Sequence, residues 1–264
     1  MLTVPKVGGS CRAHLALILG GVLGLIGCKA PSRRPPPAPP PEPRPTVEVT
    51  WREIGRSVQG RPLRAAEFGH GTNATLIFGG YHGDEPVSAD LARQLARYMA
   101  ANQHELSGCL VVVVPEVNPD GLHRGTRKNA NGVDLNRNLP ASNWRSLRRQ
   151  AVAYGGPYPG SEPETKAVIR VLGKYRPSKV ISIHQARRGP MLDYNGPAEP
   201  LARAMAQGNG YKVGMFFGNL PGSLGSYVGM DKGIPIITLE LRKGVTPEVA
   251  WRQNRAALTA AIHY

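Results

Sequence analysis

The glycine-rich stretch Gly79-Gly80-Tyr81-His82-Gly83-Asp84-Glu85-Pro86 places two side chains that can bind a metal, His82 and Glu85, three positions apart. An imidazole nitrogen and a carboxylate oxygen are both common zinc ligands. Pro86 biases Glu85 away from helical dihedral angles, and the glycines allow conformations that other residues resist, so the pattern predicts an extended turn. Read alone, a His-x-x-Glu pair is more typical of a solvated turn than of a metal site.

The elements predicted on either side fix the position of this turn. Before it, the apolar run Thr75-Leu76-Ile77-Phe78 is typical of a buried strand. After it, Leu91, Leu95 and Met99 recur at the spacing of one helical face. The turn therefore lies at the carboxyl end of a strand and leads into a helix.

Strands and helices alternate along the rest of the chain. We expect strands near residues 47–51, 61–68, 75–78, 110–114, 180–183, 213–217 and 236–239, and helices near 88–101, 162–175, 198–207 and from 247 onward. This alternation predicts an α/β fold with a mixed, largely parallel central sheet and helices on both faces. In open sheets of this kind, ligands bind outside the carboxyl ends of the strands.

Polar residues follow the predicted interior strands at that edge. They are His82 with Glu85, then Asn118-Pro119-Asp120-Gly121, then His184, and finally Glu240. One polar residue at a strand end is unremarkable, but two histidines and a glutamate at one edge match a known zinc ligand set. The second glutamate is then available as an unbound base.

From about residue 50 to its end, the sequence resembles the zinc carboxypeptidases of the carboxypeptidase A type. The motifs that carry the resemblance are, in chain order, His82-Gly83-Asp84-Glu85, Asn118-Pro119-Asp120-Gly121, Asp134-Leu135-Asn136-Arg137-Asn138, Ser182-Ile183-His184 and Thr238-Leu239-Glu240-Leu241-Arg242. The resemblance implies that residues 46–264 form a catalytic domain with one zinc ion per chain, held by His82, Glu85 and His184.

The resemblance also assigns roles in peptide-bond hydrolysis. It implies that Glu240 is the general base for the attacking water and that Arg127 stabilises the oxyanion that develops on the scissile carbonyl. Arg124 and Lys128 are neighbours that could be confused with Arg127. A strand-end carboxylate paired with Arg242 is the alternative interpretation of Glu240 in isolation.

Three further residues have implied roles in the same site. Asn136 and Arg137 match the residues that bind the substrate's terminal carboxylate, for which a planar guanidinium is well suited. Asp134 matches a carboxylate that accepts a hydrogen bond from the far nitrogen of His82 and fixes its tautomer. A surface Asn-Arg-Asn turn is the alternative for this motif.

Within the family, Gly222-Ser223-Leu224-Gly225-Ser226-Tyr227 and Ile234-Pro235-Ile236-Ile237-Thr238-Leu239-Glu240 resemble members that trim peptidoglycan peptides. This implies hydrolysis of the γ-D-Glu–meso-diaminopimelate bond. The alternatives are a carboxypeptidase of ordinary peptides and a non-catalytic cell-wall-binding lipoprotein with the same fold. A deacylase of the aspartoacylase type is disfavoured because the full Asn-Arg motif is present.

The side-chain specificity of this site is expected to depend on residues 219–227. The substrate-capping tyrosine of the digestive carboxypeptidases falls near Asn219 or Leu220, so it has no counterpart in this sequence. Tyr227 is only a nearby candidate. Tyr154 and Tyr158 lie in a glycine- and proline-containing loop, where a packing role is expected.

The first 27 residues have the pattern of a lipoprotein signal peptide. Their apolar segment, residues 15–27, is shorter than the roughly 20 residues that span a bilayer. Leu25-Ile26-Gly27-Cys28 resembles a bacterial lipobox, in which the cysteine is lipidated. Lys29 after it favours the outer membrane, by resemblance to enteric lipoproteins. We therefore expect a periplasmic protein anchored to the membrane through Cys28, with simple secretion as the alternative.

Residues 28–45 continue from that cysteine into a proline-rich linker. Prolines recur throughout residues 31–45, and proline excludes both helices and interior strands because it lacks the amide donor. At about 3.1 Å per residue in polyproline II, this segment would span about 45 Å. Such a spacer could hold a domain clear of a lipid surface.

The formal charge is +15, from 33 Lys and Arg against 18 Asp and Glu. The basic run at residues 145–149 is not interleaved with aromatic residues, so we expect no nucleic acid partner. Scattered charge of this sign fits solubility or binding to an anionic wall polymer.

Three cysteines do not indicate a disulfide framework. We expect a monomer whose remaining loop histidines, His70, His104 and His123, are solvated.

Overall fold

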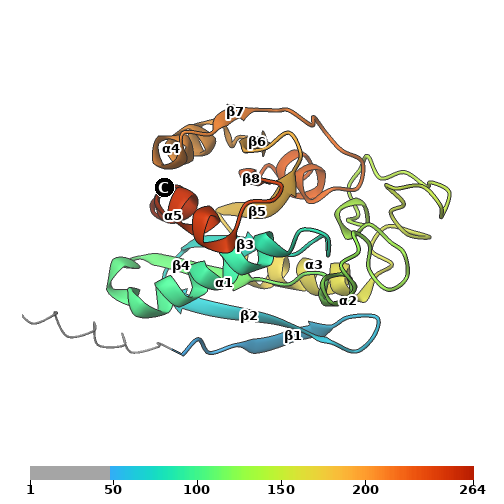
Figure 1. The fold of residues 1–264 in the computed structure, drawn as a ribbon, viewed down its shortest axis with the longest axis horizontal. Helices are drawn as coiled ribbons and strands as arrows, with labels where there is room; N and C mark the ends of the chain where they lie inside the picture. Colours follow the sequence, from blue (N-terminus) through green and yellow to red (C-terminus); the bar gives the residue numbers. More distant parts are fainter. Residues whose placement is uncertain (1–47) are drawn as a thin grey trace, which may run out of the picture. The chain divides into compact units, whose positions relative to one another are not determined.

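A computed structural model describes residues 48–264, and their central element is a mixed eight-stranded sheet (Figure 1). The strand order across the sheet is β1-β2-β4-β3-β5-β8-β6-β7. The strands are β1 (Arg52–Arg56), β2 (Pro62–Gly69), β3 (Asn73–Phe78), β4 (Cys109–Val114), β5 (Lys179–Ala186), β6 (Met191–Asn195), β7 (Lys212–Gly214) and β8 (Ile236–Arg242). The predicted signal peptide (1–27), the lipidation site Cys28 and the linker (28–45) lie outside the described residues.

The four central strands, β4, β3, β5 and β8, run parallel to one another. Antiparallel strands flank them, β2 beside β4 and β6 beside β8. The valine-rich sequence of β4 is explained by its position, because a strand between two others with both faces covered must be apolar on both sides. The predicted α/β class with a mixed, largely parallel sheet is confirmed.

Helices cover both faces of the sheet (Figure 1). One core cluster joins the sheet to α1 (Pro86–Ala101), α4 (Glu199–Asn209) and α5 (Pro247–His263). The other joins it to α3 (Pro163–Tyr175). Alternate residues of each strand point to opposite faces, so Ile77 packs in the first cluster and its neighbours in β3 pack in the second.

Three sequence-based element predictions need correction. The strand expected at residues 47–51 is instead β1, Arg52–Arg56, where main-chain pairing with β2 outweighs the apolar alternation before it. The strand expected at 213–217 ends at Gly214, and the following residues form a loop at the site described below. Strand β6 was not predicted, because the turn Arg187–Pro190 before it and the acidic residue within it obscured a five-residue strand.

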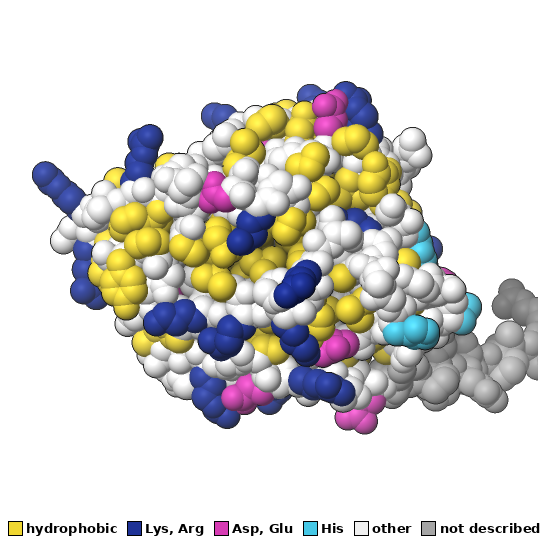
Figure 2. Space-filling view, turned by 180° about the vertical axis from the view of Figure 1, so that it is seen from behind, with side chains coloured by type: hydrophobic (Ala, Val, Ile, Leu, Met, Phe, Trp, Pro, Cys, Tyr) yellow, Lys and Arg dark blue, Asp and Glu magenta, His cyan; other side chains and the backbone are white. Residues whose placement is uncertain are grey.

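The surface carries the charge expected from the composition. Figure 2 shows Lys and Arg side chains distributed over the whole face in view, with few Asp and Glu side chains among them. His70, His104 and His123 are exposed, as predicted. Across residues 48–264, the helices are too short or too polar for any of them to cross a membrane.

Candidate metal centre

The turn that carries His82 and Glu85 connects β3 to α1 and packs against a second glycine. A Cβ atom added at Gly83 would lie 1.9 Å from the carbonyl carbon of Gly121, so no side chain fits there. The amide of Gly83 donates a hydrogen bond to the carbonyl of Thr126 at 3.0 Å. The two backbones thus fix each other, which explains why the turn is rich in glycine.

Asn118 joins the turn that carries His82 to the segment that carries Arg127. Its Nδ2 donates to the carbonyl oxygen of Tyr81 at 3.3 Å and to that of Arg127 at 3.2 Å. Its Oδ1 accepts from the amide of Gly121 at 2.9 Å, which caps the short helix α2 (Pro119–Arg124). The asparagine motif after β4 therefore positions the turn and the segment that bears Arg127.

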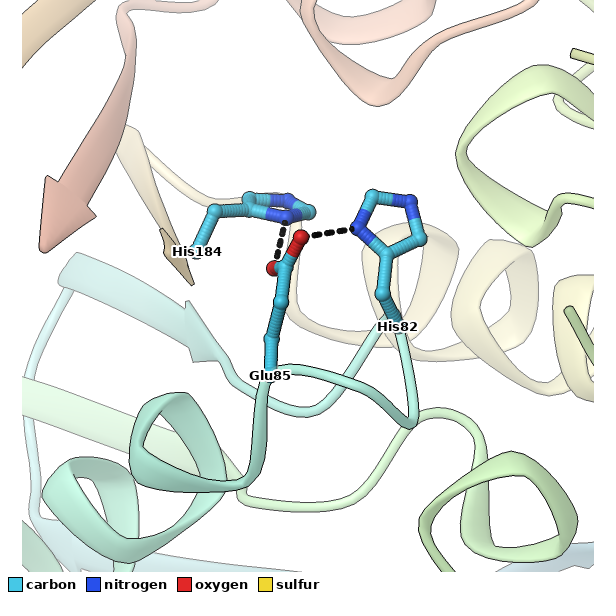
Figure 3. Close-up of side chains that lie close together, drawn as sticks. All are labelled: His82, Glu85 and His184. Carbon is cyan, nitrogen blue, oxygen red and sulfur yellow. Dashed lines mark hydrogen bonds and ion pairs between the residues drawn. The ribbon is translucent and has the colours of Figure 1, made fainter. Parts of the chain in front are cut away.

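His82, Glu85 and His184 converge at the carboxyl edge of the sheet, with His184 contributed by β5 (Figure 3). Nδ1 of His82 lies 2.8 Å from Oε1 of Glu85, and Nδ1 of His184 lies 3.0 Å from Oε2. One ligand atom from each residue lies within 4.8 Å of the others, and all three residues are buried. Two imidazole nitrogens and a carboxylate at this spacing form a donor set that fits zinc.

The charges within this centre favour a cation. Burial by itself lowers the pKa of His82, but Glu85 and Asp134 outweigh that effect and raise the pKa to about 9. For Glu85, burial acts in the opposite sense to the two imidazoles, which hold its pKa well below the usual range. Zinc binds neutral imidazole, so zinc competes with a proton for His82.

Asp134 lies behind the metal ligands and is fully buried. Its Oδ1 lies 3.2 Å from Nε2 of His82 and accepts a hydrogen bond from the amide of Asn136 at 3.0 Å. Its Oδ2 accepts from Nε of Arg127 at 3.0 Å. The carboxylate predicted to orient His82 is in place, and it also binds the predicted oxyanion arginine.

The geometry distinguishes Arg127 from Arg124 and Lys128 as the basic residue at the metal site. Nη1 of Arg127 lies 3.7 Å from Oε1 of Glu85, and its side chain lines the cavity beside the metal ligands. Arg124 is exposed at the end of α2. Nζ of Lys128 donates to the carbonyl of Ala151 at 2.6 Å. Of these three basic residues, Arg127 alone lines the cavity.

Glu240 lies on β8 directly opposite His184 in the register of β5 and β8. It is 7% exposed, and its Oε2 has no hydrogen-bond partner within the described residues. Burial, with a further contribution from the charge of Glu85, raises the pKa of Glu240 to about 8. A carboxylate in such an environment accepts a proton readily, which is the property required of a general base.

Residues 46–243 match the zinc carboxypeptidase family. The chain belongs to this family. Murein peptide amidase A of Escherichia coli K12 is 35% identical over 209 residues, which cover 70% of this chain and 78% of that protein. Murein peptide amidase A of Vibrio campbellii is 32% identical over 208 residues, 73% of this chain and 79% of that protein.

A solved structure gives the same result. The crystal structure of murein-tripeptide amidase MpaA from Escherichia coli O157 aligns with a TM-score of 0.69 at 30% identity, over 86% of this chain and 97% of that one. The predicted zinc ligands His82, Glu85 and His184 are confirmed as the metal site of a zinc carboxypeptidase.

The zinc carboxypeptidase site opens into a cavity of about 320 Å³ lined by Asn136 and Arg137. Both residues belong to the 3₁₀ turn Leu135–Arg137. Oδ1 of Asn136 accepts from the amide of Leu224 at 2.9 Å, which fixes the orientation of its amide group. Leu224, the N-cap residue of the π-helix Gly225–Met230, therefore bonds directly to the turn predicted to bind a terminal carboxylate.

The tyrosine candidates do not lie where a lid would act. Tyr227 does not line the cavity, and its ring instead lies 4.6 Å from Nζ of Lys232. Tyr158 is exposed, and the ring of Tyr154 packs near Lys128. Within residues 48–264, no tyrosine lines this cavity. Leu220, which also occupies the region predicted to correspond to the capping tyrosine, does line it.

Two residues near the site were missed in the sequence. The ring of Tyr81 stacks on His184, with 5.7 Å between ring centroids, and packs against one face of that ligand. Asp193 lines the cavity from β6. The alternation of apolar and polar residues in Leu192-Asp193-Tyr194-Asn195 is the signal that could have revealed this strand.

Proposed function

We propose that this zinc carboxypeptidase hydrolyses the γ-D-Glu–meso-diaminopimelate bond of peptidoglycan peptides. The observation that carries the proposal is the extent of the likeness to the murein peptide amidases, which spans most of both chains. The site is compatible with that chemistry, because the metal ligands, Glu240, Arg127, Asn136 and Arg137 all line one cavity.

In this proposal, different residues bind the substrate and transfer the proton. Arg137 and Asn136 bind the free carboxylate of the substrate's last residue, which makes the cleavage exo-acting. A zinc ion held by the three ligands supplies positive charge that polarises the scissile carbonyl and acidifies water. Glu240 takes the proton of the attacking water and returns it to the leaving amine, while Arg127 donates hydrogen bonds to the developing oxyanion.

The test is incubation of the purified, zinc-loaded protein with L-Ala-γ-D-Glu-meso-diaminopimelate beside a panel of ordinary dipeptides. Release of diaminopimelate by the wild type, and none by Glu240→Gln with the same zinc content, supports the proposal. A second control is the same tripeptide with the α-carboxylate of its diaminopimelate converted to an amide, which should resist cleavage.

The alternative functions give different results in the same assay. Cleavage of ordinary dipeptides alone would overturn the proposed substrate while leaving the carboxypeptidase chemistry intact. Zinc binding without turnover of any peptide would instead indicate a wall-binding protein. The complete set of ligands, base and arginines favours catalysis over that alternative.

We also propose that Cys28 is lipidated and anchors the catalytic domain to the outer membrane on its periplasmic side. The support is the lipobox-like sequence ending at Cys28, Lys29 after it, and the proline-rich stretch that follows. Cys28→Ser should release the protein from membranes into the soluble periplasmic fraction. Unchanged membrane association of this variant would overturn the anchor.

A further inference from the structure

The segment from Arg127 to Arg137 carries several side chains of the site but little regular structure. Both arginines line the cavity, and Asp134 between them bonds Arg127 and His82. The segment contains no strand, and its only helical part is the 3₁₀ turn Leu135–Arg137. A chain without a helix or strand ladder depends on side-chain contacts to hold its shape.

Asn129 organises the first half of this segment and is 2% exposed. Its Oδ1 accepts hydrogen bonds from the amides of Asn131 at 3.1 Å and Val133 at 3.0 Å. Its Nδ2 donates to Oε2 of Glu162 at 2.8 Å and to Oε2 of Glu164 at 3.2 Å. One amide side chain thus shapes the loop and ties it to the start of α3.

Glu162 is the N-cap residue of α3 and bonds to both ends of the segment. Its Oε2 also accepts from Nδ2 of Asn131 at 2.8 Å, and its Oε1 accepts from Oγ of Ser161 at 2.6 Å. Its main-chain amide donates to Oδ1 of Asn138 at 3.1 Å. The side chain therefore holds the first half of the segment, and the main chain holds the far end.

The carboxylate of Glu162 is buried among uncharged donors. It is 2% exposed, and within residues 48–264 no Lys, Arg or His forms an ion pair with it. A buried carboxylate without a counter-ion is costly to keep. Glu162 does not line the cavity, so contact with a substrate does not explain its presence. An apolar side chain would avoid the cost but would leave Asn129 and Asn131 without this acceptor.

We infer that Glu162 is a positioning residue that places Arg127 at the zinc site by holding the loop that follows it. This inference rests on the proposed function, because it takes Arg127 as the group that stabilises the oxyanion. Arg127 lies two residues before Asn129, and Asp134 directly follows Val133, whose amide Asn129 binds. Loss of the Glu162 side chain therefore displaces Arg127 and its partner Asp134 together.

The test compares Glu162→Ala with Glu162→Gln at equal zinc content, with L-Ala-γ-D-Glu-meso-diaminopimelate as the substrate. Glutamine keeps an oxygen for Asn129 and Asn131, and its NH₂ group donates to Oγ of Ser161. We expect Glu162→Ala to lower kcat by about 10- to 100-fold, because a small displacement of a catalytic group is costly. Glu162→Gln should stay within about threefold of the wild type. Equal losses in the two variants would overturn the inference.

The Michaelis constant separates this role from a general collapse of the site. The main-chain amide of Glu162 is still present in Glu162→Ala, and its bond to Asn138 holds the residue next to Arg137. KM should therefore change by less than about threefold while kcat falls. A rise in KM as large as the fall in kcat would overturn the inference, since the whole cavity would then be affected.

Two controls account for stability and for charge. Asn254 is fully buried in α5, and its hydrogen bonds lie outside the cavity lining. Asn254→Ala should lower stability and leave kcat unchanged at a temperature where the protein is folded. Asp231→Asn removes an exposed carboxylate that bonds only Ser142, and it should also leave kcat unchanged. A loss of kcat in Asn254→Ala equal to that in Glu162→Ala would overturn the inference.

Hydrogen exchange tests the same contact without any substrate. The amides of Asn131 and Val133 should exchange about tenfold faster in Glu162→Ala than in the wild type, while those of β3 stay protected. Equal exchange in the two proteins would overturn the inference. If the wild type cleaves ordinary dipeptides but not the γ-D-Glu peptide, the proposed bond is wrong. The kcat comparison is then made on those dipeptides, where equal kcat for Glu162→Ala and the wild type would overturn the inference.

Discussion

Arg127 and Asp134 form an ion pair in which Oδ2 of Asp134 lies 3.0 Å from Nε and 2.9 Å from Nη2 of the arginine. The other oxygen of Asp134 lies 3.2 Å from Nε2 of the zinc ligand His82. One buried carboxylate thus orients a metal ligand and the arginine that lines the cavity beside it. With Arg127 in its proposed role at the oxyanion, metal binding and transition-state stabilisation would be linked through this single side chain.

Replacing Asp134 should impair both functions. Asp134→Asn removes the charge that holds His82 and Arg127, so zinc affinity should fall by about 10- to 100-fold. At saturating zinc, kcat should remain low because Arg127 is no longer held in place. Zinc titration and kinetics on the same preparation check both effects, with Asp231→Asn as the control. Full recovery of kcat at saturating zinc would show that Asp134 serves only the metal.

Arg127 should affect the chemical step more than metal binding. Arg127→Ala removes the donor to the developing oxyanion, so kcat should fall by about 100- to 1,000-fold. Zinc content should stay near that of the wild type, because Arg127 is not a ligand. Arg124→Ala is the matched control, since Arg124 is exposed three residues away. A similar loss in both variants would mean that the arginine is assigned wrongly.

Much of the site could be predicted because functional residues lie at the carboxyl ends of strands in this fold. His82 and Glu85 follow β3, and His184 and Glu240 lie near the carboxyl ends of β5 and β8. These strands have easily recognised apolar sequences, and parallel strands bring their carboxyl ends to one edge. The role of Asp134 depended on the resemblance, since its contact with His82 joins residues 52 positions apart.

The parts that were missed depend on tertiary packing. Strand β6 has five residues and pairs with β8, so its apolar alternation is too brief to stand out. Asp193 went unnoticed for that reason. The role of Gly83 also could not be predicted from the sequence, because the contact that excludes a side chain comes from Gly121, in another segment. Sequence reading identified the reacting residues better than the residues that shape the pocket.

The buried carboxyl of Glu164 should give the fold a measurable pH dependence. Burial, with a smaller contribution from Glu162, raises the pKa of Glu164 to about 6. Because this pKa is raised above its unfolded value near 4.5, the stability that the protonated group contributes is full below about pH 4.5. It is lost as the pH rises through about 6, and the total amounts to about 2 kcal/mol.

The measurement is the free energy of unfolding at pH 4.5 and at pH 7, with a chelator present so that zinc does not contribute. Between these two values, Glu164→Gln should lose about 2 kcal/mol less stability than the wild type. The comparison uses the pH difference, since glutamine cannot accept hydrogen bonds at both positions used by Glu164. Glu248→Gln, on the exposed side of α5, is the control. An identical change in the free energy of unfolding between the two pH values in all three proteins would contradict the prediction.

A substitution at Gly83 tests whether the contact with Gly121 holds the turn that carries His82 and Glu85. Gly83→Ala would place a methyl group 1.9 Å from the carbonyl carbon of Gly121, so the turn must shift away from α2. The expected result is weaker zinc binding together with a loss of about 1–3 kcal/mol of stability, as for other steric insertions into packed structure. The matched control is Gly173→Ala on the exposed face of α3, where an added Cβ meets nothing within 4 Å. That variant should gain about 0.5–1 kcal/mol, since alanine favours the helix. Equal stability and zinc affinity in both variants would show that the contact with Gly121 does not position His82 and Glu85.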